Sequence, residues 1–208
     1  TGIEEIDNNA EDDGYIANLK LVGIGVTATA SPIVGTGAIR EIFLNNDGFN
    51  YSSNPTVSIS TSPSSLSGSD ATAVAITTVR AGSQSVEKIL ITNAGFGYTE
   101  VPTITITGGG GSGAAATCSI NTASNGVIRF TITQAGVGFG TAPIVTIGVP
   151  AGATAADRAT GIASIGIDPS TGFNRVNAIF LTNSGAGYTG GETVTISDPE
   201  TISGIGTY

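Results

Sequence analysis

One twelve-residue pattern occurs four times in this chain, and it constrains the fold more than any other feature of the sequence. The copies occupy residues 46–57, 93–104, 134–145 and 183–194. Their first glycines are separated by 47, 41 and 49 residues and are Gly48, Gly95, Gly136 and Gly185. A period of this length indicates an array of similar modules, each too small to fold alone.

The repeated pattern has the composition of a tight turn. An aromatic residue follows each first glycine by three positions, and in three copies a proline follows the aromatic residue by four, whereas the fourth copy has Glu192 there. The first copy has Asn50 where the others have a second glycine. Glycine supplies the positive φ that such a turn needs, and a side chain such as that of Asn93 can cap it. We predict that the aromatic rings close the ends of local cores and that the turn residues are Gly48, Tyr51, Gly95, Gly97, Tyr98, Gly136, Gly138, Phe139, Gly185, Gly187 and Tyr188.

The second module illustrates the expected secondary structure. Residues 86–92 form a β-rich run, and residues 103–107 alternate Thr with Ile, which predicts a strand with one apolar and one hydroxyl face. The glycine-rich stretch 108–113 then leads to a run of small residues at 114–120, which predicts a third strand. Comparable third strands are expected at 71–76 and 161–165. Apolar residues do not recur with helical spacing, and a short helical turn is expected only within 151–160.

These patterns predict an all-β protein, built as a tandem array of about four three-stranded β modules that is elongated or sandwich-like. Residues 1–37 are expected to form an acidic N-terminal arm followed by an orphan strand. The modules are expected at 38–84, 85–124, 125–172 and 173–208, the last of them incomplete.

The orphan strand leads to a hypothesis about assembly. It consists of Val26, Thr27, Ala28, Thr29 and Ala30, and it looks like a third strand without a module of its own, whereas the fourth module has no third strand. Unpaired strand edges tend to acquire partners. We therefore expect strand exchange, either by internal ring closure or by head-to-tail polymerisation; alternatively, the sequence starts and stops at arbitrary points. It begins with Thr and contains no Met, which indicates a processed or excised piece of a longer polypeptide, or a partial reading of one.

Composition argues against several classes of function. The net charge is −9, and the seven basic residues are scattered rather than clustered, so neither nucleic-acid binding nor an anionic membrane surface is expected. No apolar run is long enough to insert into a membrane. The single cysteine, Cys118, excludes an intrachain disulfide and is expected to be a small buried apolar residue.

No catalytic or cofactor-binding residues are identified. The chain has no histidine, which excludes the commonest general base and the triads that depend on it. The stretch 108–113 lacks the Gly-Lys-Ser ending of a phosphate loop, and residues 185–190, although they spell Gly-x-Gly-x-x-Gly, precede a strand-like run instead of a helix. The acidic residues show no paired arrangement, so no enzyme activity is predicted.

Calcium is the one candidate ligand in the N-terminal arm. Asp7, Asn9 and Glu11 place oxygen ligands at alternate positions, which suits this ion, but the spacing departs from an EF-hand loop. A solvated acidic arm is the alternative interpretation, and we favour it.

The second copy and its surroundings also resemble a known group of proteins. The run 92–106, followed by the glycine-rich loop and Ala114–Thr117, is similar to repeats in virion structural proteins of tailed marine phages of the cyanophage type. The resemblance covers about residues 38–200; similar repeats also occur in bacterial surface and adhesin-like proteins. It implies a tail fibre, baseplate, neck or surface-decoration component and no catalytic residues.

The expected function is therefore a non-catalytic structural repeat protein of a virion or extracellular filament, assembling through β-strand edges. Its expected partners are further copies of itself or other structural proteins of the same particle. The alternative is an adhesin or receptor-binding module that recognises host cell-surface glycans through the loops at the module ends. Separately, the four turn aromatics, if exposed, could form a shallow sugar-binding surface together with acidic residues. A polysaccharide depolymerase ranks third.

Overall fold

The computed structural model describes residues 25–63, 69–80 and 82–199, which form an all-β protein. In chain order the strands are β1 Thr29–Phe49, β2 Thr56–Ile59, β3 Thr72–Arg80, β4 Ser83–Asn93, β5 Ile104–Thr107, β6 Ser112–Gln134, β7 Val145–Ile147, β8 Thr160–Ile167, β9 Asn174–Asn183 and β10 Val194–Ile196. The described residues contain no α-helix, and a single 3-10 turn, η1 Ala155–Asp157, lies where the sequence allowed one. No helix in this part of the chain could cross a bilayer.

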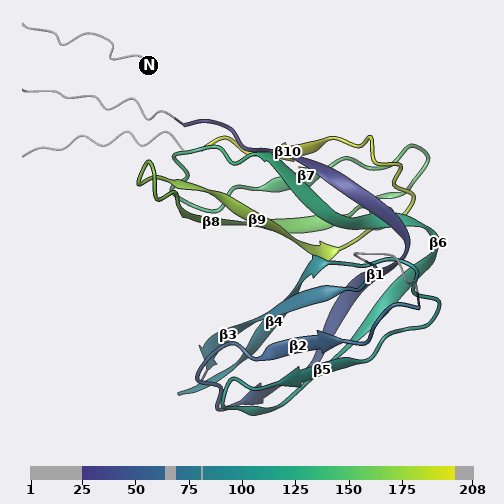
Figure 1. The fold of residues 1–208 in the computed structure, drawn as a ribbon, viewed down its shortest axis with the longest axis vertical. Coiled ribbons are helices and arrows are strands. Elements are labelled where there is room, and N and C mark those ends of the chain that lie inside the picture. Colours follow the sequence, from purple (N-terminus) through teal and green to yellow (C-terminus); the bar gives the residue numbers. More distant parts are fainter. Residues whose placement is uncertain (1–24, 64–68, 81, 200–208) are drawn as a thin grey trace, which may run out of the picture.

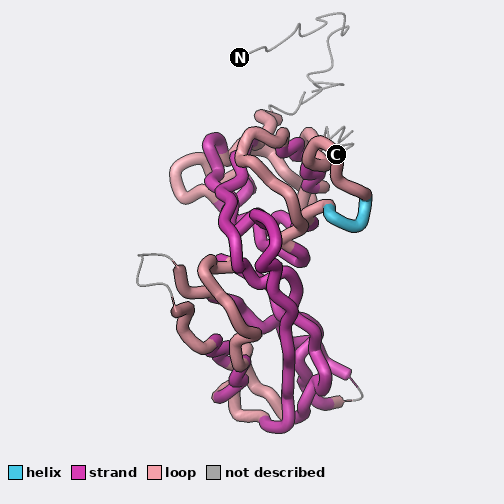
Figure 2. The backbone as a smooth tube through the Cα atoms, turned by 90° about the vertical axis from the view of Figure 1, so that its right-hand side faces the viewer, coloured by secondary structure: helices cyan, strands magenta, loops and turns pink. Residues whose placement is uncertain are grey.

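Two long strands run the length of the molecule and connect two lobes (Figures 1 and 2). β1 and β6 pair antiparallel almost from end to end. The first lobe contains residues 38–49 of β1 and 112–121 of β6, together with β2, β3, β4 and β5. The second lobe contains residues 29–36 of β1 and 125–134 of β6, together with β7, β8, β9 and β10. A shift in register between Thr36 and Ala38 marks the passage from one lobe to the other.

The remaining strands form short ribbons around the two lobes. β2 pairs with β5 in the first lobe, and β7 pairs with β10 in the second. A four-stranded sheet of order β3-β4-β9-β8 spans both lobes, and its two hairpins meet at the single pair Ile91↔Leu181.

The third strands do not pair within their own modules, so the expected modules are not self-contained. β3 is the third strand of the first module but pairs with β4, the first strand of the second. The beginning of β6 is the third strand of the second module and pairs with β1 of the first, while β8 is the third strand of the third module and pairs with β9 of the fourth. Short hairpin connections favour the β3–β4 and β8–β9 pairings, because closing a short loop costs little chain entropy. Three expected module boundaries, at 37/38, 84/85 and 124/125, consequently fall inside the strands β1, β4 and β6.

The orphan strand is paired within the chain. Thr29 lies opposite Gln134 and Ala30 opposite Ile132, and a separate bridge joins Val26 to Val137. The orphan strand lies beside the second half of β6. In the first lobe, the beginning of β6 lies beside β1 in the equivalent way. The N-terminal strand therefore takes, in the second lobe, the place that the third strand of the second module takes in the first lobe, which corresponds to internal closure.

The two ends of the described region meet where this closure occurs. The Thr27 hydroxyl donates a hydrogen bond to Asp198 Oδ1. A Cβ atom on Gly25 would lie 3.0 Å from the Pro199 ring. The second lobe is thus assembled from both ends of the described chain.

Backbone hydrogen bonds at the junction of the lobes show an internal pseudo-twofold symmetry. The third module lies 88 residues after the first and the fourth lies 90 residues after the second, as measured between Gly48 and Gly136 and between Gly95 and Gly185. Four bonds follow this symmetry, from Ile39 N to Ala94 O, Ala94 N to Ile128 O, Val127 N to Ser184 O and Ser184 N to Arg40 O, at 2.9, 2.7, 2.8 and 2.8 Å. They join β1, β6 and the residues that follow β4 and β9, and so hold the two lobes together.

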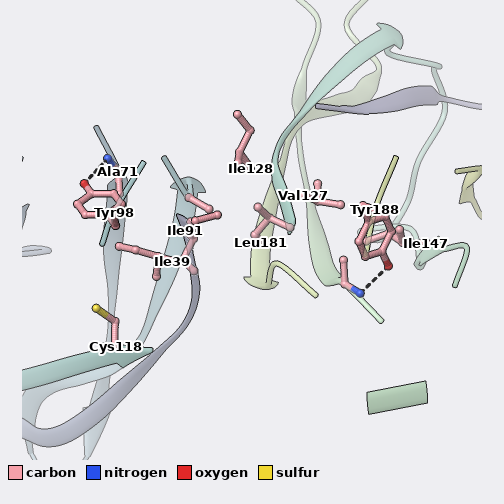
Figure 3. Packing of buried hydrophobic residues seen from close by; sticks show 13 residues of the cluster. Ile39, Ala71, Ile91, Tyr98, Cys118, Val127, Ile128, Ile147, Leu181 and Tyr188 are labelled. Carbon is pink, nitrogen blue, oxygen red and sulfur yellow. Dashed lines mark hydrogen bonds between the residues drawn. The ribbon is translucent and has the colours of Figure 1, made fainter. Parts of the chain in front are cut away.

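The apolar core has a central cluster and two outer clusters. In the central cluster Tyr98 and Tyr188 lie on opposite sides, with Ile91 and Leu181 between them (Figure 3). The outer cluster of the first lobe packs around Tyr51 and Val86, and that of the second around Phe139 and Val176. The four turn aromatics are therefore distributed over all three clusters.

Ser184 offers a test of the central junction. Its hydroxyl is fully buried and has no hydrogen-bond partner among the described residues, whereas the equivalent position in the second module is Ala94. We expect Ser184→Ala to raise the free energy of unfolding by about 1 kcal/mol, because a buried hydroxyl without a partner is destabilising. Urea denaturation measures this difference.

The reciprocal substitution, Ala94→Ser, is the matched control. It introduces a hydroxyl at a site with no exposure and is expected to lower the free energy of unfolding. Loss of stability in Ser184→Ala would contradict the proposed equivalence of the two positions.

Candidate functional site

The four repeated turns share one backbone conformation. The first glycine has φ of 63°, 65°, 65° and 65° in the successive copies. The second special position has φ of 59° at Asn50, 81° at Gly97, 88° at Gly138 and 78° at Gly187. The predicted positive φ is thus confirmed, and Asn50 adopts the left-handed conformation in place of glycine, as asparagine does more readily than most residues.

Each first glycine contacts the start of a strand that comes from another module or, at Gly136, from the N-terminal segment. These four strands are called exchanged strands below. A Cβ atom on Gly95 would lie 2.5 Å from Ser69 O and 2.8 Å from Ala71 N, so any side chain would displace β3. The same close approach to an alanine amide occurs at the other three turns, between Gly48 and Ala114, Gly136 and Ala28, and Gly185 and Ala159. Glycine is therefore needed twice, for its positive φ and for the space that it leaves.

The tyrosine hydroxyls bond to the same alanines. Tyr98 accepts a hydrogen bond from Ala71 N at 2.9 Å and donates one to Ser60 O at 3.2 Å. Tyr188 accepts from Ala159 N at 2.7 Å and donates to Gly148 O at 3.1 Å (the Tyr98 and Tyr188 bonds to alanine are dashed in Figure 3). Tyr51 accepts from Ala114 N at 3.3 Å. Phe139 has no hydroxyl to offer Ala28.

All four rings are buried. Their exposed fractions are 5, 2, 3 and 1% for Tyr51, Tyr98, Phe139 and Tyr188. Each ring is part of an apolar cluster, which supports the predicted structural role of these aromatics. The alternative, in which these rings form an exposed surface for sugar, is wrong, because burial leaves no face available to a ligand.

An asparagine side chain caps three of the turns. Asn46, Asn93 and Asn183 each accept a hydrogen bond from the amide of the first glycine, at 2.9, 3.0 and 2.8 Å. The cap predicted for Asn93 is therefore confirmed. The third copy has Gln134 at this position.

The departure of the fourth copy from the proline pattern has a local explanation. The Glu192 carboxylate accepts hydrogen bonds from Thr189 N, Thr189 Oγ1 and Gly190 N at 2.8, 2.9 and 2.9 Å. Partial burial opposes ionisation of this carboxyl, but these bonds outweigh it and lower the pKa of Glu192. A side-chain bridge thus holds the segment for which the other copies use a rigid proline ring.

Threonine pairs join three exchanged strands to their partners. The two hydroxyls of each pair are 2.5 to 2.6 Å apart, in Thr29–Thr133, Thr72–Thr92 and Thr160–Thr182. The threonine of the exchanged strand directly follows the contacted alanine in each case. Cross-strand pairs of this kind contribute to strand registry.

For the described residues, two kinds of reactive site are relevant, a cysteine nucleophile and a metal site. Cys118 is buried as predicted, with its sulfur 3.6 Å from Pro102 O, and burial raises the pKa of its thiol, which disfavours the nucleophilic thiolate. Residues 25–63, 69–80 and 82–199 contain no group of three or more metal-ligating side chains. The calcium candidates Asp7, Asn9 and Glu11 lie outside the described residues.

Sequence reasoning missed the residues that the turns contact. Ala28, Ala71, Ala114 and Ala159 begin the exchanged strands, and each is followed by Thr or Ala. Their small size was visible, but their partners were not, because the contacts join different modules. The aromatic turns themselves were found correctly from their spacing.

Comparisons of the chain with protein-family models, with curated proteins and with solved structures found no match.

The hydroxyl contacts predict the effect of removing single oxygen atoms. We expect Tyr98→Phe and Tyr188→Phe each to lower the free energy of unfolding by about 1–3 kcal/mol, because the buried alanine amide loses its acceptor. Chemical denaturation of the single variants measures the loss. Unchanged stability in both variants would show that the hydroxyl bonds do not hold the exchanged strands.

Burial of these tyrosines also predicts sensitivity to alkali. It raises the pKa of Tyr98 and of Tyr188 above the ordinary value of 10.0, with the alanine hydrogen bonds opposing the shift. The unfolded chain therefore ionises first, so this contribution to stability is complete below about pH 10 and is lost at higher pH as the phenols ionise. Melting temperatures recorded from about pH 9 to about pH 11 should fall less steeply in a Tyr98→Phe/Tyr188→Phe double variant. Equal slopes for the two proteins would contradict the assignment.

Proposed function

We propose that this chain is a non-catalytic structural component of a virion or an extracellular filament. The observation that carries the proposal is that the recurring glycines, aromatics and asparagines all serve to lock strands between modules. A repeated pattern that forms a scaffold favours a building role over a catalytic one. The resemblance to repeats of phage virion proteins points in the same direction.

Assembly through strand edges is part of the proposal. β3 and β8 are the edge strands of the four-stranded sheet, and edge strands offer backbone groups to another chain. Val79 and Ile167, at equivalent positions near the ends of these strands, are 66 and 68% exposed. Two equivalent apolar edges suit contact with further copies or with other proteins of the same particle.

Substitution at these edges tests the proposal. The full chain is expected to form ordered oligomers at micromolar concentration, measured by light scattering and electron microscopy. Val79→Lys/Ile167→Lys is expected to weaken them, because lysine on an edge strand opposes pairing with another chain. The matched control, Val101→Lys, adds charge at a residue that is also exposed but lies outside any strand.

Two results would count against a structural role. A chain that stays monomeric and binds cell-surface glycan saturably would favour the adhesin alternative. A chain that lowers the viscosity of a polysaccharide solution would favour an enzyme.

A further inference from the structure

We propose that the N-terminal strand, residues 26–34, can be donated to a second copy of this chain, in which it occupies the acceptor segment, residues 126–137. This inference rests on the proposed structural function and specifies the segment and the partner that would link the copies. In the closed molecule the donor pairs with the acceptor of its own chain, through Val26↔Val137 at one end and Val34↔Val127 at the other.

Each glycine–aromatic turn accepts a strand regardless of which part of the chain that strand comes from. At the other three turns, the strand under the glycine arrives from a preceding module, as with β3 and β8, or from a following one, as with the beginning of β6. At the acceptor segment it arrives from the N-terminus instead. At all four sites, an alanine at the start of the strand packs against the glycine and the aromatic residue of the turn. A strand from another copy carries the same residues.

The contact between the donor strand and its turn lacks a hydroxyl bond that the other three contacts have. A tyrosine hydroxyl bonds the alanine amide at Ala71, Ala114 and Ala159, whereas Phe139 faces Ala28. The other three turns are also stabilised by an asparagine cap, and the turn of the acceptor segment has Gln134 at that position. Of the four contacts between a turn and an alanine, the one at Ala28 is therefore held without a side-chain hydroxyl.

Two glycines lie where β1 passes between the lobes and provide a hinge about which the donor strand can move. Gly35 and Gly37 flank Thr36, Gly37 has φ of 68°, and the β1–β6 register shifts between Thr36 and Ala38. A change of direction at this point would release residues 26–34. Ile39 and Arg40 would remain bonded to Ala94 and Ser184 at the lobe junction. The first lobe can therefore stay folded when the strand leaves, and the central core loses only the packing of Ile33 and Val34 at its edge until another copy supplies these residues.

Exchange at this hinge joins copies through the strand contacts that the closed molecule already has. Each chain has one donor and one acceptor, so two copies can exchange strands reciprocally as a dimer, whereas donation in one direction gives a heterologous series. The strand contacts are the same in the closed and the exchanged form, and the balance between them depends on protein concentration. The outcome is a reciprocal dimer, a larger ring or a filament.

Cysteine cross-linking tests the exchange in the full chain. Thr29 Oγ1 and Thr133 Oγ1 are 2.6 Å apart, so cysteines at these positions are within reach of a disulfide. Thr29→Cys and Thr133→Cys would be placed in separate chains, both in a Cys118→Ala background. The two chains are then refolded together at high concentration and oxidised. We expect a covalent heterodimer, because a donor from one chain enters the acceptor of the other.

The Thr72–Thr92 pair provides the matched control. Its hydroxyls are 2.5 Å apart, but it joins β3 to β4, which a tight hairpin connects. We expect the Thr29→Cys and Thr133→Cys mixture to give at least about fivefold more covalent dimer than a Thr72→Cys and Thr92→Cys mixture, because a short hairpin closes within its own chain. Equal yields from the two mixtures would overturn the proposal.

Two further variants make the result specific to this strand. The double variant Thr29→Cys/Thr133→Cys, oxidised when dilute, is expected to close within one chain and then to form fewer oligomers than the unmodified chain when concentrated; failure to form this internal bond would overturn the described pairing. Phe139→Tyr adds a hydroxyl opposite Ala28 and is expected to slow the appearance of heterodimer when the two chains are mixed already folded, because each donor strand must first leave its own acceptor. An unchanged rate in that variant would show that the missing hydroxyl does not ease release of the strand.

The experiment separates this inference from the proposed function. The same amount of ordered oligomer in the internally locked double variant as in the unmodified chain would overturn strand donation and leave assembly through β3 and β8 in place. Absence of any oligomer in the unmodified chain, with no cross-linked heterodimer, would overturn both.

Discussion

The close contact between a turn glycine and the amide of an alanine on another strand is the interaction on which this structure depends. It occurs four times, with φ near 65° at every glycine. Only glycine satisfies both the backbone conformation and the lack of space, because any Cβ would meet the neighbouring backbone. Each turn therefore lets a strand from another part of the chain pack directly against it, which makes the packing of one module dependent on another.

This dependence explains why the modules combine in pairs. A module of 40 to 50 residues has three short strands and little core of its own, and its third strand completes its neighbour. Two modules with exchanged strands form a lobe, and the two lobes meet in a pseudo-twofold arrangement of backbone hydrogen bonds around Ala94 and Ser184. The central cluster then buries Tyr98, Tyr188, Ile91 and Leu181 in one continuous core.

The same architecture gives the proposed structural role a physical basis. The second lobe is completed by a strand from the far end of the sequence, so the molecule closes without a covalent link between its last and first modules. A closure of this kind keeps the molecule compact and also defines a segment that another copy can supply. The surface has few charges, with 11% charged residues in the chain, and the repeats use hydroxyl pairs instead of ion pairs along their seams. Stability and assembly would then depend on the same strand contacts.

The sequence by itself determined the class of structure and the chemistry of the turns. Alternation of Thr and Ile predicted β5, small residues predicted β3 and β8, and the spacing of glycine and aromatic residues identified turns whose rings proved to be buried. These features are local, since φ preferences and side-chain alternation act over a few residues. The partner of each strand was decided only by the tertiary structure, because the alanine beneath Gly95 is Ala71 of another module and the acceptor of Ala28 is more than 100 residues away. Such pairings depend on loop closure and on the shared burial of Tyr98 and Tyr188. They cannot be predicted from the residue pattern of either strand alone.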